Sequence, residues 1–151
     1  MGRAVATKRS IKPPRPAYVL DEQIGFILRQ VWQRHAVIFA RGIGINLTSA
    51  QWAAIAKLTE TGPCSQNQLG RLTAMDVATI KGVIDRLTAR GLTETSPDPE
   101  DGRRLLVSLT RAGAQLVEKA APNALAISKE TLAPLEPKER EQLMELLNKL
   151  R

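Results

Sequence analysis

The residues best equipped for chemistry lie in the segment AMDVATIKGVIDRLTARGL, residues 74–92. Its apolar residues recur at helical spacing, which predicts a helix capped by Asp76 and ended by Gly91. At about 100° per residue, one face of this helix is apolar and is expected to be buried. The predicted buried residues are Val77, Ile80, Ile84, Leu87 and Thr88. The opposite face and its flank carry Ala78, Thr79, Lys81, Gly82 and Arg86.

Small side chains on that face let the helix backbone approach another surface closely. A mid-helix glycine such as Gly82 costs about 1 kcal/mol relative to alanine, so helix stability alone does not favour it. The major groove of DNA admits an α-helix and exposes donors, acceptors and thymine methyl groups. Ala78 and Thr79 suit thymine, and Lys81 can reach a guanine edge or a phosphate. Arg86 is placed for a phosphate. A solvated surface and packing on another protein are the alternatives.

A second charged group lies in PDPEDGRR, residues 97–104. These turn residues separate segments 92–96 and 105–109, which alternate and are rich in Thr, Val and Leu, so the sequence predicts a β-hairpin. Asp101 is expected to pair with Arg103 and hold its guanidinium, beside Arg104. An arginine on such a wing is favoured in a narrow minor groove. A solvated charged loop is the alternative, but a helix-turn-helix directly ahead favours DNA.

Residues suited to catalysis or metal binding are few. His35 is the only histidine and Cys64 the only cysteine, so we expect no enzyme activity, no metal site and no cofactor. Cys64 precedes Ser65, an expected helix cap, where a helix N-terminus can lower a thiol pKa. Oxidation sensing through Cys64 is therefore a minor hypothesis. A single cysteine also excludes an intramolecular disulfide framework and fits a reducing cytosol.

These candidate residues need a framework of helices to position them. Helical periodicity predicts a long helix over 19–41, and Thr48, Ser65 and Thr110 are expected caps of later helices. Leu69 and Leu72 of the short helix after Ser65 are expected to face inward. The helix after Thr110 should continue to about residue 132, kinked at Pro122, and a last helix should follow Pro137.

The order of these elements is that of a winged helix-turn-helix, a mainly α fold with a small β-hairpin wing. Long N- and C-terminal helices with wide apolar stripes are expected to form a homodimer, and packing of these stripes within one chain is the alternative. The expected domains are a disordered basic arm (1–18) and a single domain (19–151), in which 19–45 and 111–151 dimerise and 48–110 form the winged helix-turn-helix.

Net charge supports DNA binding only after its location is considered. The chain carries a formal +7, but the first 20 residues hold five of its bases and no acid, while residues 57–104 are balanced. The claim of DNA binding must therefore rest on individual bases. No apolar run is long enough for a membrane span and no secretory signal is present, so a cytoplasmic protein without a membrane partner is expected.

Two motifs resemble those of MarR-type bacterial transcription regulators. They are D-x-x-T-x-x-x-x-D-R-L-x-x-x-G-L from Asp76 to Leu92, and D-x-R-x5-L-T from Asp101 to Thr110. The resemblance implies a homodimer on a pseudo-palindromic operator of double-stranded DNA, usually a repressor. It also implies release by a small, often aromatic, ligand bound between the dimer region and the DNA-reading lobes.

Carried over by position, the resemblance assigns DNA contacts to the recognition helix and to the wing. The expected DNA-binding residues are Ser65, Gln66, Asn67, Ala78, Thr79, Lys81, Gly82, Arg86, Asp101, Arg103 and Arg104. Many relatives have a basic residue where Gly82 stands and an arginine where Thr95 stands, so readout is expected to fall on Lys81 and Thr79. The segment AMDxATIKGV is similar to the same segment in a branch of MarR-type regulators that controls aromatic-acid catabolism and includes sensors of aryl-CoA thioesters.

A candidate effector site combines apolar walls with a few donors. The expected effector-binding residues are Arg29, Trp32, Arg34, His35, Phe39 and Trp52. For a CoA thioester, Arg29, Arg34 or the basic arm would meet the phosphates. A histidine satisfied within the core is the alternative for His35. The alternative function is a winged-helix protein–protein interaction module that does not bind DNA.

Overall fold

The computed structural model describes residues 15–151, and most of the predicted basic arm lies outside this range. A short 3-10 turn, η1 (Leu20–Glu22), precedes six helices and three strands. The elements are α1 (Ile24–Gly42), α2 (Ser49–Thr61), β1 (Cys64–Ser65), α3 (Gln66–Leu72), α4 (Val77–Ala89), β2 (Thr93–Pro97), β3 (Leu105–Leu109), α5 (Arg111–Thr131) and α6 (Pro137–Lys149). The predicted winged helix-turn-helix with long terminal helices is confirmed.

Four of the predicted helix caps are present. The side chains of Thr48, Ser65, Asp76 and Thr110 each accept a backbone N–H from the first turn of α2, α3, α4 and α5. At α2 the Gln51 amide oxygen also accepts the Thr48 N–H at 3.0 Å, which completes a capping box. Helix α5 continues through Pro122 and ends at Thr131. The caps therefore set where each helix begins.

The hairpin extends an antiparallel sheet of order β1-β3-β2. The predicted first strand, 92–96, lies one residue later, and Thr93 pairs with Leu109 at its start. β1 was not predicted; in it Cys64 pairs with Val107 and Ser65 with Leu106. This pairing fastens the hairpin to the chain immediately before α3, so the wing and the helix-turn-helix form one unit.

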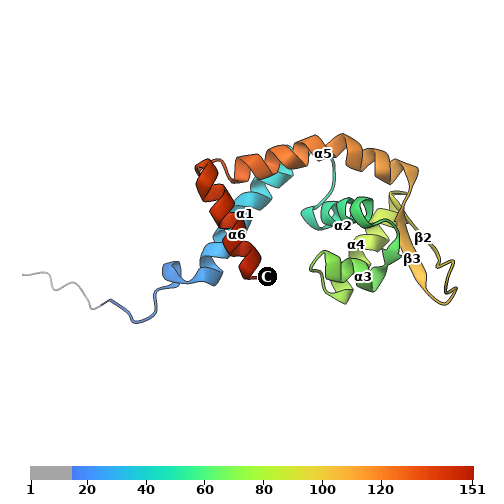
Figure 1. Ribbon diagram of the computed structural model, residues 1–151, viewed down its shortest axis with the longest axis horizontal. Helices are drawn as coiled ribbons and strands as arrows, with labels where there is room; N and C mark the ends of the chain where they lie inside the picture. Colours follow the sequence, from blue (N-terminus) through green and yellow to red (C-terminus); the bar gives the residue numbers. More distant parts are fainter. Residues whose placement is uncertain (1–14) are drawn as a thin grey trace, which may run out of the picture.

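Two apolar clusters organise the described chain. The larger lies among α2, α3, α4 and the sheet, where Ile55, Leu69, Ile80 and Leu87 are fully buried. The smaller joins Ile38, Phe39 and Ile43 at the end of α1 to Ala120 and Ile127 of α5. Helix α5 thus reaches from the winged lobe to α1, along the top of the molecule in Figure 1.

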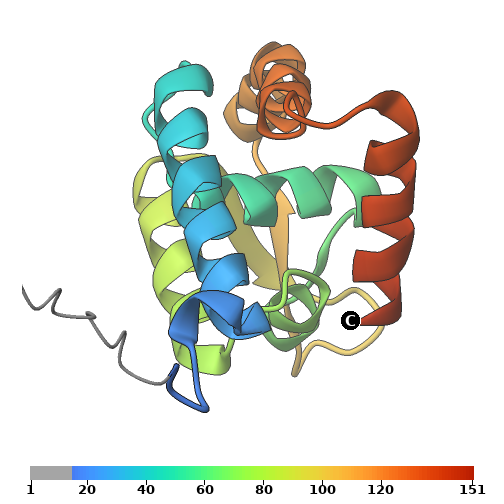
Figure 2. The same ribbon diagram turned by 90° about the vertical axis from the view of Figure 1, so that its left-hand side faces the viewer.

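The helices at the end away from the wing leave apolar side chains exposed. α1 and α6 are the two helices nearest the viewer in Figure 2, and α6 has no buried residue. The exposed apolar residues on these helices include Ile24, Ile27, Leu28, Val31, Trp32, Met144, Leu146 and Leu150. Surfaces of this extent normally mark an interaction site.

Several burial predictions were wrong. Val77 is 65% exposed and Leu72 is 43% exposed, because the turn between α3 and α4 carries both away from the core. Val83, absent from the predicted buried face, is buried. Thr88 is exposed, and its hydroxyl shares a hydrogen bond of 2.9 Å with that of Thr93.

Candidate nucleic-acid interface and effector cavities

The predicted DNA-facing side of α4 is exposed. Ala78, Thr79 and Lys81 are solvent-exposed. The Lys81 ammonium lies 2.6 Å from the Asp85 carboxylate, one turn further along. Both groups are more than half exposed, so the pair contributes about 0.5 kcal/mol or less and a phosphate can replace Asp85.

Asp76 fixes the start of this helix. Its carboxylate accepts the Thr79 backbone N–H at 2.7 Å. This hydrogen bond lowers the pKa of Asp76 below its ordinary value, so the carboxylate is charged at neutral pH at the positive end of the helix. The Thr79 hydroxyl also hydrogen-bonds this carboxylate, so the side chain of Asp76 serves the first turn of the helix.

The three predicted DNA-contact residues at the start of α3 differ in role and in exposure. The Ser65 hydroxyl accepts the Gln68 N–H at 3.3 Å and acts as the helix cap. Asn67 is exposed, whereas Gln66 is half-buried and lines a small cavity beside Asp85 and Thr88. Of the three predicted residues, Asn67 is therefore the most accessible to DNA.

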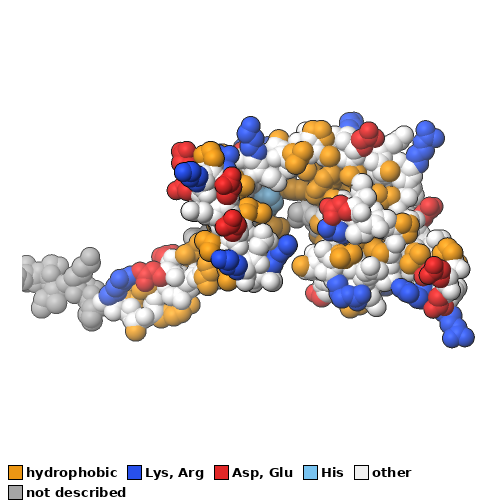
Figure 3. Space-filling view, in the orientation of Figure 1, with side chains coloured by type: hydrophobic (Ala, Val, Ile, Leu, Met, Phe, Trp, Pro, Cys, Tyr) orange, Lys and Arg blue, Asp and Glu red, His pale blue; other side chains and the backbone are white. Residues whose placement is uncertain are grey.

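The wing turn is held differently from the prediction. Asp101 does not pair with the Arg103 guanidinium; its carboxylate accepts the Arg103 backbone N–H at 3.1 Å. The Arg104 guanidinium instead lies 3.9 Å from the Asp98 carboxylate. Arg103 is therefore the arginine whose side chain extends from an ordered turn with no partner among residues 15–151. In Figure 3 basic side chains lie along the lower edge of the winged lobe and at its tip.

Cys64 does not have the features of an oxidation sensor. Its side chain is buried in the larger core cluster, although it begins the strand before the α3 cap. Burial raises the pKa of the Cys64 thiol, outweighing its hydrogen bond with Thr61. The expectation of a lowered thiol pKa was wrong, because the side chain points into the core rather than at the helix end.

The predicted aromatic residues meet in one cavity. Trp32, His35, Phe39 and Trp52 line a space of about 270 Å³ between α1, α2 and α5. The Thr131 hydroxyl donates to the Ile127 carbonyl at 2.9 Å, so the His35 Nδ1–H donates to Thr131. The His35 Nε2 then remains available as an acceptor. His35 is thus both satisfied by the protein and exposed to the cavity.

The predicted cations of that site lie elsewhere. The Arg34 guanidinium donates to the Thr131 carbonyl at 2.7 Å and to the Glu130 carbonyl at 3.3 Å, so it caps the end of α5. Arg29 does not line this cavity. Among residues 15–151, no lysine or arginine side chain lines this cavity to meet a carboxylate.

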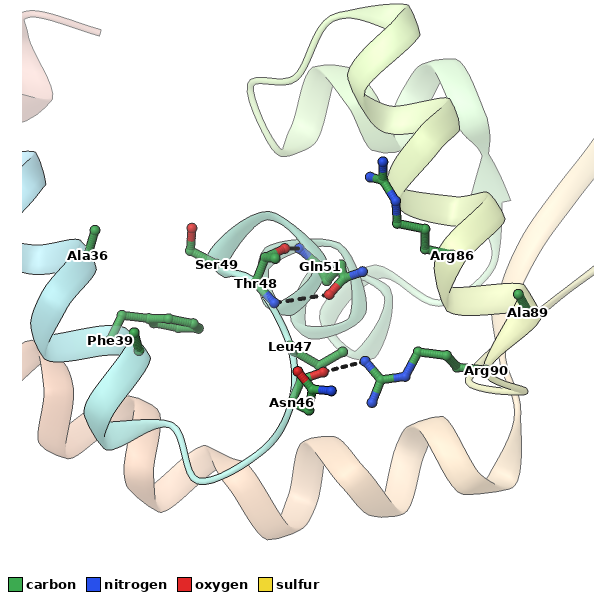
Figure 4. A pocket seen from close by; sticks show the side chains of 11 residues that line it. Ala36, Phe39, Asn46, Leu47, Thr48, Ser49, Gln51, Arg86, Ala89 and Arg90 are labelled. Atoms are coloured by element: carbon green, nitrogen blue, oxygen red, sulfur yellow. Dashed lines mark hydrogen bonds between the residues drawn. The ribbon is translucent and has the colours of Figure 1, made fainter.

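A larger cavity, of about 640 Å³, was not predicted. It lies between the end of α1, the start of α2 and the second half of α4. Figure 4 shows the Arg90 side chain extending to the loop before α2, where it donates to the Asn46 carbonyl, and the Arg86 side chain running the other way along α4. The polar residues that line it are Asn46, Thr48, Ser49, Gln51, Arg86 and Arg90. Sequence periodicity placed Arg86 on the DNA side of α4 and gave no signal for Arg90, because the facing loop after α1 comes close only in the folded chain.

Comparison with known proteins places this architecture in a family. Residues 47–105 match the family model described as MarR family. The HTH-type transcriptional repressor NicR of Pseudomonas putida is 41% identical over 134 residues, which cover 88% of this chain and 85% of NicR. The chain belongs to the MarR family. It is a winged helix-turn-helix transcriptional regulator, as the motifs around α4 and the wing predicted.

Two solved structures agree with this assignment. A probable transcriptional regulator from Pseudomonas aeruginosa is 59% identical, with a TM-score of 0.84 over 88% of this chain and 100% of that one. BpsR of Bordetella bronchiseptica is 42% identical, with a TM-score of 0.85 over 89% of this chain and 97% of that one. The BpsR structure concerns regulation of its DNA binding by 6-hydroxynicotinic acid. Within residues 15–151 of this MarR-family chain, no helix has the length and apolar character of a membrane span.

Gly82→Ala is expected to make the free protein more stable and its DNA binding weaker. The Cβ would lie 3.7 Å from the Arg86 guanidinium, an ordinary contact. Stability should rise by about 0.5–1 kcal/mol, because alanine is the better helix former. At a groove the added methyl prevents close approach, so affinity for the operator should fall at least about threefold. Thermal melts and fluorescence anisotropy measure the two effects. A stability gain with unchanged affinity would show that Gly82 does not lie at the DNA surface.

Proposed function

We propose that this chain is a homodimeric repressor that binds a pseudo-palindromic operator and releases it when a small aromatic acid binds. The observation that carries the proposal is the exposed, small-residue face of α4 beside a wing whose Arg103 side chain is unpaired among residues 15–151. Relatives of 41% and 42% identity, one a repressor and one regulated in its DNA binding by 6-hydroxynicotinic acid, support it.

The homodimer is proposed from the exposed apolar surface of the terminal helices. The exposed apolar side chains of α1, of α6 and of the residue after it need a partner surface; they include Ile24, Leu28, Val31, Leu146 and Leu150. A second copy supplies one, and two-fold symmetry presents two α4 helices to successive major grooves. We retain the division into a dimer region, 19–45 and 111–151, and a DNA-reading region, 48–110. The protein would act in the cytoplasm, where its operator is.

The proposed effector is an aromatic acid, with hydroxynicotinic acids as the first candidates. The cavity of about 270 Å³ lined by Trp32, His35, Phe39 and Trp52 has room for one substituted ring. The CoA portion of an aryl-CoA thioester would have to lie outside this space, so we favour the free acid over the thioester.

The experiment for this proposal is footprinting and anisotropy with DNA from upstream of the gene. We expect protection of two half-sites about one helical turn apart, with affinity that falls steeply as salt rises. In the alternative, a winged-helix module for protein contacts, no such fragment would bind above the level of random DNA. That result would overturn the proposal.

A further inference from the structure

We infer that Asn123 is a positioning residue that sets which spacing of operator half-sites the dimer accepts, an inference that rests on the proposed function. The side-chain amide nitrogen of Asn123 donates to the Ile43 backbone carbonyl at 3.1 Å. This bond joins α5 to the end of α1, where the dimer region meets the winged lobe. It therefore lies at the point from which the angle of the lobe is set.

Two connections carry the winged lobe. The loop after α1, residues 43–48, leads into α2, and α5 follows directly from the wing strand β3. In Figure 1 this loop passes below α5 on its way to α2. The larger apolar cluster lies mainly in the lobe and the smaller one in the dimer region. Within residues 15–151, Ile45 and Trp52 are the two residues that pack against both clusters, and both are only partly buried. The angle of the lobe therefore depends on how the two connections are held.

Helix α5 lacks a hydrogen bond where it passes from one cluster to the other. Val117 belongs to the larger cluster and Ala120 to the smaller. Pro122 has no N–H, so the helix cannot make its usual bond to the Glu118 carbonyl. Bends in helices concentrate at such positions. The lobe can therefore turn about residues 118–122 unless a contact outside the helix restrains it.

The end of α1 is shaped so that the Asn123 amide reaches it. Gly44 has a φ of +69°, in the left-handed region that favours glycine. A Cβ on Gly44 would lie 2.8 Å from the Asn123 side-chain nitrogen, so any other residue would displace the amide. A Cβ on Gly42 would lie 2.8 Å from Cγ1 of Ile127. The two glycines thus let the end of α1 approach α5 closely enough for the bond to form.

A lobe held at a fixed angle selects the spacing of the operator half-sites. One inserted base pair moves the second half-site by about 3.4 Å and turns it by about 35° around the DNA axis. A dimer with rigid lobes cannot follow both changes, so it loses contacts at one half-site. A dimer whose lobes turn about residues 118–122 follows them in part. Loss of the Asn123 bond should therefore lower selectivity for spacing.

The test is fluorescence anisotropy with the natural operator and with a copy that carries one extra base pair between its half-sites. We expect wild type to bind the natural operator at least tenfold more tightly than the copy. In Asn123→Asp, which keeps the size of the side chain but removes the donor, this ratio of affinities should fall at least threefold. Gly44→Ala should lower the ratio in the same way, because its Cβ displaces the Asn123 amide. Gln115→Glu makes the same amide-to-acid change at an exposed position of α5 and should keep the wild-type ratio.

The ratio of affinities separates positioning from stability. A variant that is partly unfolded binds both DNA fragments more weakly by the same factor, so the ratio is unchanged. A second measurement uses the free dimer, with a spin label on each lobe at Glu94→Cys, an exposed position of β2. Cys64 is buried, so the added cysteine is the accessible thiol. The distances between the two labels, measured by double electron–electron resonance, should spread more widely in Asn123→Asp than in Gln115→Glu.

The outcomes distinguish this role of Asn123 from the proposed function. An Asn123→Asp protein with the wild-type ratio and the wild-type spread of distances would overturn the positioning role. A wild type that binds both spacings equally would overturn it as well. A wild type that fails to bind its operator would contradict the proposed function, while a wider spread of distances in Asn123→Asp would still support the positioning role.

Discussion

Replacing Gly113 by alanine should destabilise the protein by about 3 kcal/mol. A Cβ at this position would lie 2.1 Å from the Leu92 backbone carbonyl oxygen and 3.0 Å from its carbon. A backbone carbonyl cannot rotate away as a side chain can, so α5 and the start of the wing would have to separate. For a chain of this size, the loss corresponds to a fall in Tm of roughly 6–12 °C.

The same junction positions the wing. The Leu92 carbonyl accepts the Thr110 N–H at 3.1 Å, and the Thr110 hydroxyl donates to the Gly91 carbonyl at 2.6 Å. These bonds join the end of α4 and the start of β2 to the N-terminus of α5. A displaced α5 would therefore also change the angle between recognition helix and wing, and we expect DNA binding to weaken beyond what partial unfolding explains.

The matched control is Gly82→Ala, since both are glycine-to-alanine changes within helices. Helix propensity alone predicts that both raise stability. The structure instead predicts opposite signs, because the nearest atom is 2.1 Å away at Gly113 and 3.7 Å away at Gly82. Thermal and urea unfolding followed by circular dichroism compare the two. A Gly113→Ala protein that melts at or above wild type would contradict the packing described for this junction.

Arg103→Ala is expected to weaken operator binding at least about tenfold and to leave the dimer and the melting temperature unchanged. Asp101 holds the Arg103 backbone N–H rather than the side chain, so the turn persists without the guanidinium. The Arg103 side chain is exposed, so its loss removes contacts with DNA and leaves the packing of the protein unchanged. If Arg103 lies near a phosphate, the slope of log affinity against log salt concentration should also decrease by about one, because one counterion fewer is released on binding.

Lys119→Ala is the control for charge. It also removes one exposed positive charge, from α5, which crosses the opposite side of the winged lobe from α3. Its effect on operator affinity should stay within about twofold at moderate salt, where distant charges are screened. Anisotropy titrations at several salt concentrations, with light scattering for the dimer, measure both variants. Equal affinities for Arg103→Ala and wild type would remove the wing from the DNA interface.

The sequence was most informative where local patterns determine structure. Each cap at Thr48, Ser65, Asp76 and Thr110 is a bond between residues three apart, so a short motif is enough to predict it. The hairpin was predicted for the same reason. β1 was missed because its two residues become a strand only by pairing with β3, some 40 residues away in the chain.

Packing between distant segments explains the remaining differences. Periodicity assigned Val77 to the core, but the first residue of α4 lies at the edge of the lobe, where its side chain is mostly exposed. Arg34 was grouped with the aromatic residues of α1, although the carbonyls at the end of α5 hold its guanidinium. In the sequence, Arg90 is only the residue before Gly91, the predicted helix end. Its hydrogen bond to the Asn46 carbonyl could not be predicted, because it depends on how the loop after α1 folds.

The most direct test of the account is operator release by an aromatic acid. Fluorescence anisotropy would follow the wild-type chain on a labelled fragment from upstream of its gene, with and without saturating 6-hydroxynicotinate. We predict that the acid weakens operator affinity at least tenfold, a coupling of about 1.4 kcal/mol, while 6-hydroxynicotinamide has little effect. An operator affinity that stays the same when calorimetry shows the acid bound would contradict the account.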